Sequence, residues 1–210
     1  MSLYLTSSPK DCSKKGFHIN KLNKKLLYTL STLILSILSA TFLIWLILHP
    51  SKPEFSLRDT SLYELSLSSP HLLNSTIQTT IVSKNPNDRV GIYYDQLRVY
   101  AAYKGQQITA DSLLPPFYQG HQDSNLLSAS LHGTGMPVAP SFGYEVGRDQ
   151  TAGRLYLGLK LDGQLRWKVG TWVSGRYRFD VDCMAVIAIR PGDTSGLLSS
   201  VQGNQCSTTV

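Results

Sequence analysis

The chain has 210 residues, of which 42% are hydrophobic and 16% charged, with a formal net charge of +6 and three cysteines. The charge is concentrated at the start, because residues 1–25 contain six lysines and one aspartate and so carry +5. The rest of the chain carries only +1, which excludes a basic nucleic-acid-binding domain as the source of the charge.

Residues 1–25 are polar and basic with little apolar periodicity, which predicts a largely disordered tail. A lysine-rich segment next to a membrane attracts anionic lipids of the inner leaflet. These lipids are therefore the expected partner of the tail.

Residues 26–48, LLYTLSTLILSILSATFLIWLIL, are uncharged and contain neither Gly nor Pro. As a helix this run is roughly 35 Å long, enough to cross a hydrocarbon core of about 30 Å. One alternative is a secretory signal peptide cleaved after Ser39-Ala40, but its apolar part is usually about 7–15 residues long. The other is a buried helix of a soluble protein, for which the rest of the sequence offers no helical partner. We predict a retained signal-anchor helix in contact with the lipid bilayer.

The lysines also predict the orientation of this helix. Lysine and arginine are retained on the cytoplasmic side, so the N-terminus is expected in the cytosol and residues 49–210 outside it. Residues 49–53, HPSKP, contain two prolines, which stop the helix and keep the chain extended. We expect a short, stiff spacer there.

Residues 54–210 are rich in Tyr, Val, Leu, Ser and Gly and read as short strands separated by turn signals. The strand candidates are residues 55–67, 71–83, 90–103, 125–131, 154–161, 165–169 and 175–189. Prolines in the connection 114–120 bar a central strand there, and residues 133–137 are expected to form a loop. With no further helix expected, this pattern predicts an all-β domain built as an antiparallel β-sandwich.

Two features of this domain depend on an exterior location. Asn74 begins the sequon Asn74-Ser75-Thr76, and the alternation of the strand turns Asn74 outward and Ile77 and Ile81 inward, so a glycan is expected on Asn74. Cys183 and Cys206 are expected to form a disulfide in an oxidising compartment. The alternative is a pair of free thiols.

Several motifs resemble the plant harpin-induced-like and non-race-specific-disease-resistance-like (NHL) family. The most specific is the turn Asn85-Pro86-Asn87 with Gly91, Tyr93, Tyr94 and Asp95 close behind it. Weaker matches are residues 114–120, 165–170 and 177–182, and the resemblance covers about residues 42–190.

The resemblance implies a single-span membrane protein of the plant plasma membrane, associated with defence and stress responses. Its exterior part would be a type-2 late embryogenesis abundant (LEA) domain with an immunoglobulin-like or fibronectin-like β-sandwich. The family has no established catalytic residues. An Asn-Gly-Asp adhesion motif proposed for one member does not occur in this sequence.

The sequence gives no motif for catalysis. His121 and His132 are isolated, and there is no Gly-x-Ser-x-Gly, no Gly-rich phosphate loop and no His or Cys pair at metal-ligand spacing. We expect no catalytic residues, no metal and no cofactor.

Four cations near the last hairpin are the candidate ligand site. If residues 165–169 pair with residues 175–182, one face carries Arg166, Lys168, Arg176 and Arg178, and the other carries Trp167, Tyr177, Phe179 and Val181. Clustered like charges destabilise a strand pair, so they can mark a site for an acidic wall polysaccharide or a phospholipid head group. The simpler interpretation is a solvated face whose repulsion is relieved by Asp162, Asp180 or Asp182.

These observations lead to one functional expectation and one alternative. The expectation is a non-catalytic plasma-membrane protein that acts as an interaction or signalling component in plant defence and stress, with protein partners. The alternative is a lipid-binding or polysaccharide-binding protective module at the boundary between membrane and wall.

Overall fold

The computed structural model describes residues 21–48, 50–69, 71–189, 198–199 and 205–210. It divides into two compact units, Met1–Ile47 and Leu48–Val210. The first contains helix α1 and the second contains all the strands. Most of the expected tail, residues 1–20, lies outside the described residues.

Helix α1 runs from Lys21 to Leu48. Within the described chain it is the one helix long and apolar enough to cross a membrane, over Asn23–Leu43, and no other part of the structure buries it. It begins five residues before the predicted span, so the expectation of disorder was wrong for residues 21–25. Lysine and leucine are good helix formers, and extending an existing helix is far easier than starting one.

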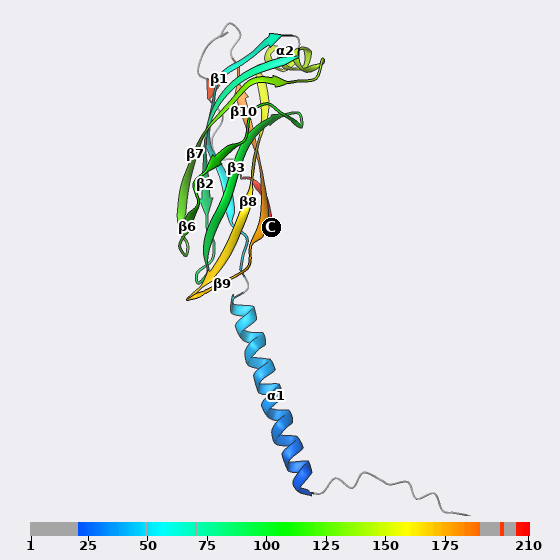
Figure 1. The fold of residues 1–210 in the computed structure, drawn as a ribbon, viewed down its shortest axis with the longest axis vertical. Coiled ribbons are helices and arrows are strands. Elements are labelled where there is room, and N and C mark those ends of the chain that lie inside the picture. The colour runs from blue at the N-terminus through cyan, green and yellow to red at the C-terminus, as the bar shows by residue number, and fades with distance from the viewer. Residues whose placement is uncertain (1–20, 49, 70, 190–197, 200–204) are drawn as a thin grey trace, which may run out of the picture. The chain divides into compact units, whose positions relative to one another are not determined.

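The second unit is an antiparallel β-sandwich, as predicted (Figure 1). The smaller sheet has the order β11-β1-β2-β7 and the larger has the order β12-β10-β8-β3-β4, with β5 and β6 paired to β3 and β9 paired to β8. The smaller sheet consists of β1 (Glu54–Ser69), β2 (Leu72–Lys84), β7 (Ser124–Pro137) and β11 (Leu198–Ser199). The larger consists of β3 (Gly91–Tyr103), β4 (Gln106–Gln107), β5 (Ser112–Leu114), β6 (Phe117–Gln119), β8 (Arg154–Val169), β9 (Trp172–Val173), β10 (Tyr177–Ala188) and β12 (Ser207–Thr209).

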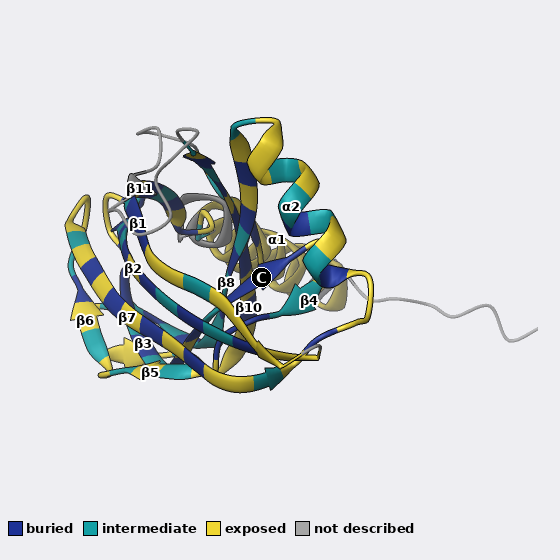
Figure 2. Cartoon of the chain, turned by 90° about the horizontal axis from the view of Figure 1, so that it is seen from above, coloured by how far each residue is buried: buried dark blue, intermediate teal, exposed yellow. Residues whose placement is uncertain are grey.

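The core lies between the two sheets and follows the alternation of the sequence. Ile77 and Ile81 are fully buried while Gln78 between them is exposed. Figure 2 shows the same alternation of buried and exposed residues along β7. Across the core, the ring of Phe55 on β1 stacks on that of Phe179 on β10, with centroids 5.9 Å apart. Each sheet therefore has one face in the core and one face free for other roles.

Two strand predictions need correction. Residues 154–161 and 165–169 are not two strands but the single strand β8, and residues 133–137 continue β7 rather than forming a loop. Both places contain glycine, which lowers the intrinsic propensity for a strand. Residues in these stretches pair with neighbours on β10, β3 and β2, and the backbone hydrogen bonds to these neighbours keep both stretches in the extended strand conformation.

The expectation of no further helix was also wrong. Helix α2 runs from Phe142 to Thr151, where two glycines and weak periodicity hide it from propensity arguments. Only Phe142 and Val146, four residues apart, are buried. Polar contacts complete its attachment to the end of β3: Tyr103 donates a hydrogen bond to Asp149 (2.8 Å), and Lys104 Nζ lies 3.3 Å from Glu145 Oε2 and 3.2 Å from Asp149 Oδ2.

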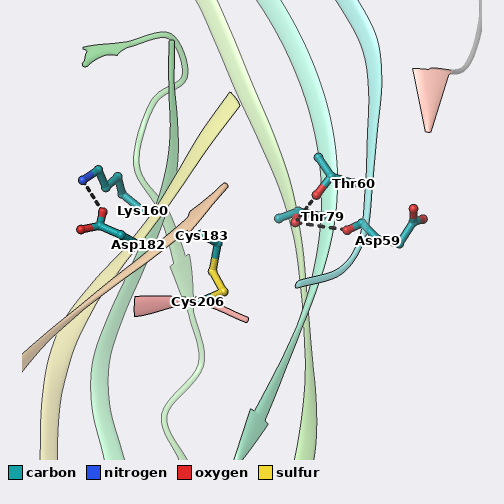
Figure 3. Close-up of a disulfide and its surroundings, with 7 residues drawn as sticks. All are labelled: Asp59, Thr60, Thr79, Lys160, Asp182, Cys183 and Cys206. Atoms are coloured by element: carbon teal, nitrogen blue, oxygen red, sulfur yellow. Dashed lines mark hydrogen bonds and ion pairs between the residues drawn. A yellow bond between two sulfur atoms is a disulfide. The ribbon is translucent and has the colours of Figure 1, made fainter. Parts of the chain in front are cut away.

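The C-terminal segment is attached to both sheets. Cys183 on β10 and Cys206 form a disulfide (Figure 3), and β12 pairs with β10. The backbone N–H of Cys206 donates to the carbonyl of Phe55 on β1 (2.9 Å). The disulfide thus joins the edge of the larger sheet to a segment that also contacts the smaller one.

Replacing both Cys183 and Cys206 by alanine should lower the free energy of unfolding by about 3 kcal/mol, because their sequence separation is 23 and the cross-link restricts the unfolded chain. Denaturant unfolding of the full chain in detergent micelles under non-reducing conditions measures this. Cys12→Ala is the control and should leave stability unchanged. An unchanged double variant would contradict a structural disulfide.

Candidate functional site

The Asn85-Pro86-Asn87 turn lies between β2 and β3 and is held by side-chain amides. Asn85 is fully buried, and its Nδ2 donates to the carbonyls of Val90 and Gly120, both at 2.8 Å. Asn87 Oδ1 accepts from Ser51 N (2.7 Å), and Asn87 Nδ2 donates to Ser51 O (2.8 Å). The motif therefore joins the β2–β3 turn to the loop after β6 and to the spacer before β1, which is a structural role.

Gly91 and Tyr93 line one side of β3 together with Tyr118 of β6. The Tyr118 ring covers Gly91, so a Cβ at position 91 would overlap the Tyr118 hydroxyl. Tyr93 packs against the same ring, with centroids 4.7 Å apart. A side chain at position 91 would therefore require the half-exposed Tyr118 ring to move.

Tyr94 points into the core, where burial raises the pKa of its phenol. Its hydroxyl donates to Gln119 Oε1 (3.2 Å) and lies 3.2 Å from Ser83 Oγ. Gln119 is itself fully buried and donates to the carbonyls of Ser83 (2.8 Å) and Asp123 (3.0 Å). Sequence reasoning missed Gln119, since its partners are distant in the chain and only its place beside Phe117-Tyr118 in a Pro-rich connection marks it.

The four predicted cations lie at one end of the larger sheet, and two of them share a carboxylate. Arg166 makes a bidentate pair with Asp95 (Nε–Oδ2 and Nη2–Oδ1, both 2.8 Å), and Arg176 Nε lies 3.5 Å from Asp95 Oδ2. Hydrogen bonds from Arg166 hold the pKa of Asp95 below its usual range, although partial burial opposes this. Lys168 instead places its ammonium group over the rings of Tyr93 (5.6 Å) and Tyr118 (4.9 Å).

Arg178, like Lys168, forms no ion pair with any other described residue, and it is exposed on β10. It lines an open hollow of ≈ 890 Å³ on the outer face of the larger sheet. The charged residues around this hollow are Asp95, Arg98, Asp162, Arg176, Arg178 and Asp180, and apolar walls come from Leu113, Leu114, Pro116 and Phe179. Arg98 is paired, since its Nε donates to Asp162 (3.0 Å).

The carboxylates that pair with the predicted cations are not the ones expected from the sequence. Asp162 pairs with Arg98, and Asp182 pairs with Lys160 (Figure 3), so neither neutralises the predicted cations. Asp95 takes that role, because β3 pairs with β8 and brings Tyr93 opposite Arg166. Asp95 belongs to the motif, but its partners were not predicted.

Two other sequence features lie apart from the hollow. Asn74 is half-buried on β2, and its Oδ1 accepts from Gly135 N (2.9 Å). His132 lies beside Ser130 on β7 (Nε2–Oγ 2.9 Å). Among the described residues, no three His, Cys, Asp or Glu side chains gather as a metal site would require.

The chain is similar to several known proteins. Residues 80–183 match the family described as late embryogenesis abundant protein. NDR1/HIN1-like protein 26 of Arabidopsis thaliana is 55% identical over 100% of both chains, and NDR1/HIN1-like protein 1 of the same plant is 42% identical over 85% of this chain and 86% of that protein. Among solved structures, a putative LEA protein aligns with 15% identity over 82% of this chain and 92% of its own, with a TM-score of 0.37.

Asp95→Asn should lower the free energy of unfolding by about 1 kcal/mol at pH 7 and change its dependence on acid. Because the pKa of Asp95 is lowered on folding, its contribution is present above about pH 4 and is lost as the pH falls through the folded value. Unfolding of both proteins from pH 7 to pH 3 should therefore give a difference that shrinks towards pH 3. Asp180→Asn, on the same face, is the charge-matched control, and a difference independent of pH would contradict this role of the Asp95–Arg166 pair.

Proposed function

Because this chain belongs to the family of NDR1/HIN1-like proteins, we propose that it is a non-catalytic, single-pass membrane protein that acts as an interaction or signalling component in plant defence and stress responses. The observation that carries the proposal is the uncovered apolar surface of α1. Its large apolar side chains from Leu26 to Leu43 are all about half exposed or more. In water such a surface is costly, and a bilayer removes that cost.

Polar groups on α1 also suit a bilayer. The hydroxyls of Thr29, Thr32 and Thr41 each donate to the carbonyl three residues earlier, at 2.9 Å. Within hydrocarbon every polar group needs an internal partner, and these bonds supply one. A helix with bonded threonine hydroxyls and no charge between Leu26 and Leu48 fits the role of an anchor.

The proposed orientation places the lysine-rich tail in the cytosol, against anionic lipids of the inner leaflet, and the sandwich outside the cell at the plasma membrane. The excess of lysine before α1 supports this direction. The Cys183–Cys206 disulfide supports an oxidising compartment for the sandwich.

Mapping of the full chain in sealed microsomes tests the orientation. Protease added outside the vesicles should remove the tail and leave residues 49–210 intact, because the membrane shields the lumenal side. If Asn74 carries the predicted glycan, glycosidase treatment after detergent should shift the mobility of the wild type.

The variants separate the two readouts. Asn74→Gln should lose the glycosidase shift and keep the protease protection, while the control Asn125→Gln should behave as the wild type. Digestion of residues 49–210 in intact vesicles would overturn the orientation. Extraction of the full chain by alkaline carbonate would overturn the anchor.

A second candidate function rests on Arg178 and the hollow beside it. An exposed guanidinium without a carboxylate partner among the described residues, next to the apolar Leu113 and Leu114, suits an anionic ligand with apolar parts. Acidic wall polysaccharide and anionic phospholipid are the candidates. Arg166 and Arg176 are less available, since both are paired with Asp95.

The double variant Arg178→Glu/Lys168→Glu should weaken binding to pectate or to liposomes containing phosphatidylserine at low salt, because it reverses the two cations that lack a carboxylate partner in the described chain. Co-sedimentation with each ligand measures the effect and distinguishes the two sources. Arg154→Glu, exposed at the other end of β8, is the control with one reversed charge. Binding that is equal in all three proteins would contradict this second function.

A further inference from the structure

The turn between β8 and β9 presents an exposed tryptophan at the end of the sandwich from which the spacer leaves. Trp172 is 63% exposed and lies outside the core cluster, and Val173 beside it is also exposed. An indole in water leaves a large apolar area uncovered, yet it suits a boundary where one side is apolar and the other wet. Its position relative to the spacer indicates that this boundary is the membrane surface.

The spacer between α1 and β1 is short and is bonded to the sandwich. Ser51 is fixed on the sandwich by its two hydrogen bonds with Asn87, and Lys52 Nζ donates to the carbonyl of Thr208 (2.9 Å). Ser51 is the third residue after Leu48, the last residue of α1, and three residues of chain span at most about 11 Å. Ser51, which is bonded to the Asn87 turn, therefore stays within that chain length of the helix end, whatever the direction of the helix.

The β8–β9 turn lies at this same end. Gly91, four residues after Asn87, pairs with Lys168, and Lys168 and Val169 pair with Val173 and Trp172. Figure 1 shows β9 at the end of the sandwich where β1 begins. The exposed indole thus belongs to the part of the sandwich that the spacer keeps near the membrane.

The turn is built to hold its shape. It has two central residues, and Gly170 has φ +58°, which glycine adopts without strain. Behind it, Ser174 N donates to the Trp167 carbonyl and Trp167 N donates to Ser174 Oγ, both at 2.9 Å. Because Trp167 is buried, the tip is connected directly to the core and presents Trp172 with little loss of freedom on binding.

We propose that the tip of the β8–β9 turn, Val169–Val173, is a second membrane contact, with Trp172 in the interfacial layer of the leaflet on the sandwich side. This rests on the proposed function, in which α1 spans that membrane. Tryptophan is enriched at membrane interfaces, where head groups add roughly 5–8 Å to each side of the hydrocarbon core. Lys168, on the strand that carries the tip, adds a cation next to it, with its ammonium group 4.9 Å from the Tyr118 ring centroid.

Site-specific fluorescence in lipid nanodiscs tests the contact with the full chain. In a Cys12→Ala background, a polarity-sensitive probe is placed at one of three positions: Leu38→Cys on α1, Thr171→Cys at the tip, or Tyr144→Cys, which is exposed on α2. The probe at Thr171 should emit at shorter wavelength than the probe at Tyr144. Lipids with a spin label near the head group should quench the probe at Thr171. Iodide in the buffer should quench this probe less than it quenches the probe at Tyr144.

The three positions separate the possible results. An aqueous signal at Thr171 with a lipid signal at Leu38 would overturn the tip contact while keeping the anchor. An aqueous signal at Leu38 would overturn the anchor and the tip contact with it. Trp172→Ser in the Thr171→Cys protein should return the emission towards the aqueous value, and a signal unchanged by this substitution would refute the role assigned to Trp172.

Discussion

One end of the sandwich depends on the hydrogen bonds made by the side-chain amides of Asn85 and Asn87. A buried amide left without partners costs roughly 1–3 kcal/mol per group, so these side chains keep their partners together. Asn85 fixes the turn against the loop after β6, and Asn87 fixes the spacer on the turn. The position of Ser51 on the sandwich, just before β1, is therefore determined by two side chains that act through hydrogen bonds and carry no charge.

The outer face of the larger sheet depends on the register of its strands. Asp95 reaches Arg166 because the pairing of β3 with β8 shifts between Tyr94 and Leu97. At this irregularity the carbonyl of Gln96 approaches Gly163 so closely that a Cβ at position 163 would overlap it. A glycine in β8 thus permits the bulge that aims Asp95 at two arginines, and the bulge leaves the neighbouring hollow lined by the remaining charges.

The features that could be predicted are those encoded by local pattern. Alternation identified Ile77 and Ile81 as core residues, and composition identified α1 and the sandwich. The partners of Asp95 and of Gln119 could not be predicted, because they depend on contacts between strands far apart in the chain. Helix α2 has poor intrinsic propensity and gains its stability from Phe142, Val146 and the ion pairs of Lys104. Patterns within one segment carry no signal for such long-range support.

The short spacer changes how strong a surface contact has to be. A single tryptophan binds a membrane weakly when the protein is free in solution, since its apolar area must offset the lost freedom of the whole molecule. In the proposed anchoring that loss has already occurred, because α1 holds the sandwich at the bilayer and the effective concentration of lipid at the β8–β9 turn is high. A weak contact through Trp172 is then sufficient to limit rotation of the sandwich about the spacer. The hollow beside Arg178 would in consequence keep a defined direction relative to the membrane, which is what recognition of a fixed wall polymer or a neighbouring protein requires.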